Sequence, residues 1–198
     1  MSHTFIIKDV VGALSRGEPV ILPTDTLFAL SVDATSEKAV SNLFEIKGRE
    51  LEKALPVFVS SFEQAEKFFE FNDLAMKLAK KFWPGPLTLI LKLKGKLAKN
   101  LSTSEKIAVR MPSSSLIMEI INSFGKPITG TSANSSGNND IFDYQELLLT
   151  FKDKVPIIVK GEIQNNAKPS TVIDYSNNTV QFLRVGSISE DSILRLIS

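Results

Sequence analysis

The sequence contains no cysteine and a single histidine, His3, among its 198 residues. The absence of cysteine excludes disulfides, thiolate nucleophiles and cysteine-bound metals, and it fits a protein of a reducing compartment. With one imidazole near the N-terminus, the chain cannot build a histidine-based catalytic triad or a metal site from several histidines. Any chemistry must therefore use carboxylates, hydroxyls, amides and cationic side chains.

The sequence also lacks a long apolar run and a large excess of either charge. No stretch approaches the roughly 20 apolar residues that a spanning helix needs, and no basic segment precedes an apolar run at the N-terminus. We therefore expect a cytoplasmic protein without a membrane segment. The formal net charge is +1, so an anion site must come from local clusters of cations. The glycine-rich phosphate-binding patterns G-x-x-x-x-G-K-[ST] and G-x-G-x-x-G are absent as well.

Short β-rich runs alternate along the chain with segments of helical period. Apolar spacing predicts helices over residues 6–18, 36–50 with a Ser36 cap, 61–70, 72–83, 113–125, 144–151 and 189–198. Extended runs predict strands over residues 19–32, in two pieces about a corner at 23–26, and over 54–60, 87–95, 106–112, 126–131, 155–161, 169–176 and 179–186. With no linker to divide residues 1–198, the pattern predicts one α/β domain whose mixed sheet is covered by helices.

Cationic side chains gather at the ends of predicted elements. Lys47 and Arg49 stand where a helix ends, and Lys53 precedes a strand. Arg110 and Arg184 each end an apolar strand. Taken singly, a cation near a helix C-terminus complements the helix dipole, and a charge at a strand end guards a sheet edge. Taken together, these cations indicate an anion pocket, because ligands of open α/β sheets gather at strand ends.

Small hydroxyl and amide side chains occur at the same strand ends. They are Thr24 and Thr26 on either side of Asp25, Ser132 and Asn134, and Ser170 and Thr171. Each one alone fits a local turn or cap, since these side chains readily bond to nearby backbone groups beside Pro or Gly. Their recurrence at segment ends favours a ligand site.

Seven segments in a fixed order carry a resemblance to a known family: "LPTDTLFAL", "EIKGRELEKALPV", "FWPGPLTLIL", "IAVRMP", "ITGTSANSSG", "PSTVID" and "LRVG". The chain resembles the YrdC/Sua5 family of threonylcarbamoyl-AMP synthases over residues 19–186, and we expect the single-domain form, without the extra C-terminal domain of the longer Sua5 form. The resemblance implies a twisted, YrdC-like sheet with a concave basic cleft. It also implies a reaction in which L-threonine, bicarbonate or CO2, and ATP give threonylcarbamoyl-AMP and pyrophosphate. The product would pass to a separate tRNA threonylcarbamoyl-transferase complex.

The resemblance also implies roles for individual side chains. Thr26, Arg110 and Ser170 match the positions that bind threonine, with Arg110 on the substrate carboxylate. The ATP-binding positions match Lys47, Arg49, Lys53, Ser132, Asn134 and Arg184. Lys47 and Arg49 would act catalytically through their charge, with no covalent nucleophile, and Mg²⁺ would be carried by the phosphates.

The chain departs from the family pattern at several positions. Phe28 and Ala29 stand where many members have Tyr-Gly, Phe58 stands near a histidine of some members, and Asp140 replaces a small hydroxyl residue. Three other readings stay open: a non-synthase relative that binds nucleotide or, weakly, RNA; a carbamoyl-transfer domain; and a structural interaction module.

Overall fold

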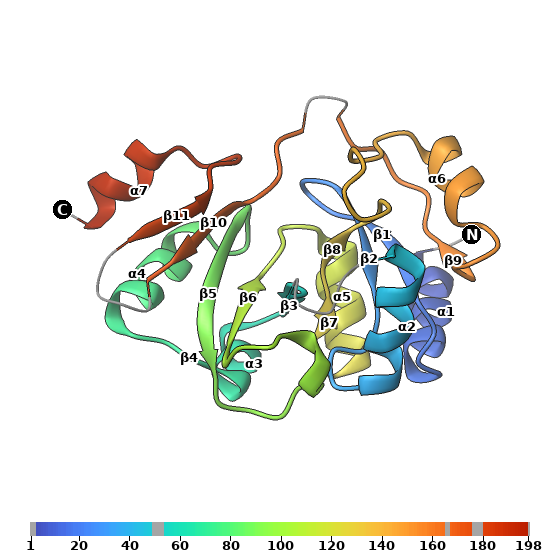
Figure 1. Cartoon of the computed structure of the whole chain (residues 1–198), viewed down its shortest axis with the longest axis horizontal. Coiled ribbons are helices and arrows are strands. Elements are labelled where there is room, and N and C mark those ends of the chain that lie inside the picture. Colours follow the sequence, from blue (N-terminus) through green and yellow to red (C-terminus); the bar gives the residue numbers. More distant parts are fainter. Residues whose placement is uncertain (1–2, 49–53, 165–166, 176–179, 198) are drawn as a thin grey trace.

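The computed structural model describes residues 3–48, 54–164, 167–175 and 180–197 (Figure 1). Its helices lie where the apolar periods predict them: α1 (His3–Ser15), α2 (Glu37–Lys47), α3 (Phe62–Phe68), α4 (Asp73–Phe82), α5 (Ser115–Phe124), α6 (Tyr144–Phe151) and α7 (Glu190–Ile197). A 3₁₀ turn, η1 (Lys99–Leu101), lies between the two longest strands. Within the described ranges, no helix has the length and apolar character that a bilayer crossing demands.

The strands form two mixed sheets. Their bounds are β1 (Val20–Pro23), β2 (Phe28–Ser31), β3 (Val57–Phe58), β4 (Phe69–Glu70), β5 (Leu87–Leu93), β6 (Lys106–Arg110), β7 (Ile128–Thr129), β8 (Thr131–Ser132), β9 (Ile157–Ile158), β10 (Thr171–Asp174) and β11 (Gln181–Arg184). The smaller sheet has the order β8-β2-β1-β9, and the larger has the order β11-β10-β5-β6-β3-β7, with β4 also on β5. β5 is antiparallel to β6 and parallel to β10. The predicted mixed α/β architecture is confirmed.

Residues 128–132 join the two sheets, because β7 belongs to the larger sheet and β8 to the smaller one. The backbone N–H of Thr129 donates to the Val32 carbonyl at 2.9 Å. In return, the Val32 N–H donates to Thr129 Oγ1 at 3.0 Å. The end of β2 is thereby tied to β7, and in Figure 1 β7 and β8 lie between the strands of the two sheets. Residues 128–132 therefore connect the two sheets, and hydrogen bonds fix this short segment to the end of β2.

Buried apolar side chains form a large core and a smaller one. In the large core, Leu87, Leu89 and Leu91 of β5 pack with residues from several helices, including Leu43 of α2 and Leu78 of α4. In the smaller core, α1 lies against α5 and both cover β1. Because side chains alternate along a strand, β5 directs its leucines into the core and Thr88 to the opposite face.

Helix α2 has the ends that its sequence predicts. Ser36 Oγ accepts from the Ala39 N–H at 3.2 Å, which caps the first turn. Gly48 ends the helix in the left-handed region, at φ 57°, a conformation that glycine adopts at little cost. The predicted cap is confirmed, and Lys47 falls in the last turn of the helix.

Some predicted elements are wrong in extent. The helix expected over 61–70 ends at Phe68, and Phe69–Glu70 forms β4, which pairs with β5. Over a short apolar run, the spacing of apolar residues does not distinguish a helix from a strand. Here pairing with β5 favours the strand, since the Lys94 N–H, just after β5, donates to the Phe68 carbonyl at 2.8 Å. The strand expected over 54–60 is limited to β3, and the one over 155–161 to β9.

Candidate functional site

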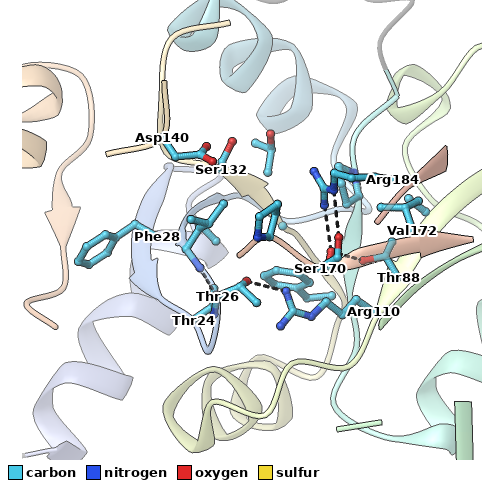
Figure 2. A pocket seen from close by; sticks show the side chains of 18 of the residues that line it. Thr24, Thr26, Phe28, Thr88, Arg110, Ser132, Asp140, Ser170, Val172 and Arg184 are labelled. Carbon is cyan, nitrogen blue, oxygen red and sulfur yellow. Dashed lines mark hydrogen bonds between the residues drawn. The ribbon is translucent and has the colours of Figure 1, made fainter. Parts of the chain in front are cut away.

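A cavity of about 240 Å³ opens between the two sheets (Figure 2). One wall comes from the corner after β1 and from the β2–β8 edge. The other comes from β3, β6, β5, β10 and β11 of the larger sheet. The polar and aromatic residues on its walls are Thr24, Thr26, Phe28, Phe58, Thr88, Arg110, Thr131, Ser132, Asp140, Ser170 and Arg184.

Arg110, at the end of β6, is the most firmly held cation of the cavity. Its Nε donates to the Gly85 carbonyl at 2.9 Å, and its Nη1 donates to Thr26 Oγ1 at 2.8 Å. Its Nη2 forms an ion pair with Asp25 Oδ1 at 2.6 Å. The residue is only 3% exposed. Burial lowers the pKa of Arg110, and the Asp25 carboxylate opposes that shift. A guanidinium stays charged in proteins, so a fixed positive charge lies at the cavity wall.

The corner between β1 and β2 places a hydroxyl beside this charge. Thr24 Oγ1 accepts from the N–H groups of Thr26 and Leu27, at 2.9 and 3.0 Å. The Thr24 side chain therefore stabilises the turn. Thr26 Oγ1 lies 3.1 Å from Thr24 Oγ1 and accepts from Arg110. The turn therefore holds the Thr26 hydroxyl toward the guanidinium, as Figure 2 shows.

The second cation of the cavity is Arg184, at the end of β11, which lies beside Ser170 at the start of β10. Arg184 donates to the Ser170 carbonyl through Nε and to Ser170 Oγ through Nη2, both at 3.0 Å. Ser170 Oγ also lies 2.8 Å from Thr88 Oγ1. Partial burial lowers the pKa of Arg184, and the Asp140 carboxylate opposes that shift. Thr171, by contrast, points into the fold, where its Oγ1 donates to the Ile188 carbonyl at 2.6 Å.

The loop after β8 is organised around Lys47. The Lys47 ammonium donates to the Ser132 carbonyl at 2.5 Å, and to the Asn134 carbonyl and Asn134 Oδ1 at 2.9 Å each. Ser132 Oγ donates to the same Oδ1 at 2.9 Å, and Asn134 Nδ2 donates to the Asn138 carbonyl at 2.8 Å. Lys47 is only 2% exposed, so its ammonium lies under the loop and stabilises it through these hydrogen bonds.

The structure brings most of the predicted site residues together. Thr26, Arg110, Ser132, Ser170 and Arg184 line the cavity. Lys47 and Asn134 lie behind its wall and fix the Ser132 loop. Arg49 and Lys53 lie outside the described residues. The departures Phe28, Ala29, Phe58 and Asp140 all reach the cavity.

Sequence reasoning missed Thr88 as a cavity residue and gave Asp25 no role. Thr88 had a readable signal, since it is the polar residue in an otherwise apolar "LTLIL" run whose leucines face the core. Asp25 had none, because its meeting with Arg110 depends on how β1 and β6 are placed in space.

The charges of the cavity favour an anionic ligand without forming a purely basic surface. Arg110 and Arg184 act on each other, since Arg184 contributes to lowering the pKa of Arg110. An anion between two guanidinium groups relieves that repulsion and can accept paired hydrogen bonds from each. Asp25 and Asp140 carry as much formal negative charge as the two arginines carry positive charge, so an anion is attracted by the guanidinium groups locally and not by a basic surface. Among the described residues there is no group of three acidic or histidine side chains that could hold a metal ion.

Comparisons with known proteins show which family the sequence matches. A family model described as telomere recombination, and named for Sua5, YciO and YrdC, matches residues 12–186. The chain is 34% identical over 194 residues to the threonylcarbamoyl-AMP synthase of Pyrococcus abyssi (strain GE5 / Orsay), which covers 96% of this chain and 57% of that protein. It is 33% identical over 183 residues to the threonylcarbamoyl-AMP synthase of Vibrio parahaemolyticus, over 90% of this chain and 98% of that protein.

A solved structure gives the same picture in three dimensions. The crystal structure of P. abyssi Sua5 complexed with L-threonine matches this chain with a TM-score of 0.94 at 32% identity, over 100% of this chain and 58% of that one. The chain thus spans less than two thirds of the Pyrococcus proteins and nearly all of the Vibrio protein.

Proposed function

This chain belongs to the Sua5/YciO/YrdC family, and we propose that it is a threonylcarbamoyl-AMP synthase, a nucleotidyltransferase that acts on L-threonine, bicarbonate or CO2, and ATP. The observation that carries the proposal is the pair of arginines, Arg110 and Arg184, on the walls of one cavity whose other polar groups are mainly hydroxyls. Its synthase relatives and the threonine complex of P. abyssi Sua5 support the choice of substrates.

The reaction needs position and charge more than it needs a nucleophile on the protein. The ammonium group of threonine loses a proton, the free amine adds to CO2, and the adduct releases a second proton to solvent and becomes a carbamate. A carbamate oxygen then attacks the α-phosphorus of ATP, and the bond to pyrophosphate breaks. Three anionic groups, the carboxylate, the carbamate and the triphosphate, must come together in this step, and fixed cations lower the cost of that approach. A site without histidine or cysteine is sufficient for it.

We propose that the two substrates occupy different ends of the cavity. We assign the threonine carboxylate to Arg110, because its guanidinium is buried and held in place by three neighbours. Thr26 and Ser170 would present hydroxyls to the amino acid. We assign the phosphates to Arg184 and to the Ser132 loop, which the buried Lys47 supports from behind.

Other parts of the proposal come from the family resemblance. Arg49 and Lys53 would add charge at the triphosphate, and with them the cleft would be basic. Mg²⁺ would arrive on the phosphates of ATP, with no step assigned to it. The adenylate would pass to a tRNA threonylcarbamoyl-transferase complex in the cytoplasm, and weak RNA contact by the same face is a secondary expectation.

Pyrophosphate release from ATP tests the proposal. The assay is run with and without L-threonine and with and without bicarbonate, and the product is identified by mass spectrometry. A synthase releases pyrophosphate only when both co-substrates are present and gives threonylcarbamoyl-AMP in equal amount. Pyrophosphate release that does not depend on threonine, or ATP binding without any product, would instead favour a nucleotide-binding relative of the synthases.

A further inference from the structure

Phe58 and Gly130 are packed against each other at the cavity wall. Phe58, in β3, is only 3% exposed, and Gly130 connects β7 with β8. A Cβ added at position 130 would lie 2.3 to 2.5 Å from three carbon atoms of the Phe58 ring. The backbone of Gly130 is not in the left-handed region, so the requirement for glycine here is one of space. Only a hydrogen atom fits between this backbone and the ring.

The backbone of Gly130 cannot easily move away from the ring. Its N–H donates to the Pro56 carbonyl at 2.8 Å, and the neighbouring Thr129 N–H donates to the Val32 carbonyl at 2.9 Å. On its other side, Thr131 pairs with Leu30 of β2. A larger residue at 130 would therefore displace the ring. Since Phe58 and Gly130 both border the cavity, the cavity is the space that a displaced ring would enter.

The same ring meets the guanidinium that we assign to the substrate carboxylate. Phe58 and Arg110 are register partners on the adjacent strands β3 and β6, and the Arg110 Cζ lies 5.9 Å from the ring centroid. At this distance a guanidinium is attracted by the aromatic ring, more so when both are desolvated. A ring that shifts into the cavity would change this contact and narrow the space beside Arg110.

We infer that Phe58, kept in place by the missing side chain of Gly130, is a positioning residue for Arg110 and shapes the threonine end of the cavity. The inference rests on the proposed function. It also accounts for a departure from the family: with phenylalanine at 58, this wall offers no hydrogen bond, so the amino acid is oriented by Arg110 and the hydroxyls alone. Positions 58 and 130 should then behave as a coupled pair.

The test compares Gly130→Ala, Phe58→Leu and the double variant, with Gly12→Ala as control. A Cβ at Gly12, in α1, would meet only the flexible Arg16 side chain, at 3.4 Å. Folding is checked by circular dichroism, and L-threonine and ATP are titrated by calorimetry. We expect Gly130→Ala to weaken L-threonine binding on the order of tenfold to a hundredfold, because a displacement of about 1 Å at a positioning contact has effects of that size.

Rescue separates positioning from general damage. Leucine is smaller than phenylalanine, so the double variant should regain L-threonine affinity to within about threefold of Phe58→Leu, as expected for coupled neighbours. The KM for L-threonine should rise in Gly130→Ala while the KM for ATP stays nearly constant. Unchanged L-threonine binding in Gly130→Ala, or a double variant that binds L-threonine clearly more weakly than Phe58→Leu, would overturn the inference.

The outcome can be told apart from a failure of the proposed function. If the unmodified protein does not bind L-threonine, the proposed function fails and takes the assigned role of Phe58 with it. The packing of the pair is then still measurable, since Gly130→Ala should lower Tm and the double variant should restore it. If Gly130→Ala does not fold, Phe58→Leu alone decides: we expect weaker L-threonine binding with unchanged ATP binding, and no change in either would overturn the inference.

Discussion

Replacing Lys47 by methionine tests how the Ser132 loop is held. Methionine keeps the unbranched stem and removes the ammonium, which donates to the Ser132 carbonyl, the Asn134 carbonyl and Asn134 Oδ1. Hydrogen bonds from a charged donor contribute about 1.5–3 kcal/mol each. Burying the lysine charge costs several kcal/mol, which methionine avoids. We therefore expect Lys47→Met to lose roughly 2–4 kcal/mol of stability.

Thermal unfolding measures this loss. In a protein of 198 residues, 1 kcal/mol corresponds to about 2–4 °C in Tm, so Tm should fall by roughly 5–15 °C. Lys38→Met is the matched control, since Lys38 lies on the same helix and is exposed; surface changes of this kind stay within about 0.5 kcal/mol. A Lys47→Met protein as stable as Lys38→Met would show that these bonds do no more than offset the cost of burying the lysine charge.

The same variant distinguishes two roles for Lys47. If Lys47 acts beneath the loop, ATP binding should weaken together with stability, because Ser132 and Asn134 lose their support. If Lys47 instead binds a phosphate directly, as the family resemblance implies, ATP binding should be lost while Tm changes little. Calorimetric titration of ATP well below the Tm of each variant decides between them, and the second result would refute the positioning role.

Three further predictions concern the cavity itself. Ser132→Ala should weaken ATP binding by roughly 1–3 kcal/mol. Ser136→Ala should matter less, because the Ser136 backbone N–H, which donates to the Lys47 carbonyl, is kept in the variant. Equal ATP affinities of Ser132→Ala and the unmodified protein in calorimetry would remove Ser132 from the nucleotide site. Asp25→Asn leaves Arg110 without its counter-ion and should cost on the order of 3 kcal/mol of stability. Thermal melts should then show a larger stabilisation by L-threonine than in the unmodified protein, and an equal shift would contradict the assignment of Arg110. In pyrophosphate release, L-threonine should be preferred over L-valine by on the order of a hundredfold or more, and equal rates would exclude a site built around the hydroxyls.

The sequence predicted the helices well because their signals are local. The α2 stripe repeats every three or four residues and its start and end have their own residues, Ser36 and Gly48. The same stripe contains information that was not used. Lys47 lies three residues after Phe44, four after Leu43 and seven after Val40, all buried, so its stem belongs to the buried face. That spacing indicates that the Lys47 side chain is directed toward the core. Its charge alone indicates instead a position at the ligand.

The site was predictable in its residue types and not in its contacts. Strand ends carrying Arg110, Ser170 and Arg184 could be identified one at a time, since each follows or opens an apolar run. Their meeting depends on which strands are neighbours, and β5 lies beside β10 although they are more than 70 residues apart in the sequence. The contact between Ser170 and Thr88 follows from that pairing alone, and no local pattern encodes it.

The two arginines of the cavity differ in how firmly they are held, and this difference supports the assignment of its two ends. Arg110 is buried and fixed by a carbonyl, a hydroxyl and a carboxylate. A cation that is fixed in this way suits a small anion that always arrives in one orientation, such as the carboxylate of an amino acid. Arg184 is less buried than Arg110, and within the described part of the chain its hydrogen bonds go to Ser170, so it can adjust to a group whose charge changes during the reaction. The triphosphate is such a group, since pyrophosphate leaves as the carbamate oxygen binds phosphorus. A site with the reverse arrangement would have to reorganise its buried charge at every turnover.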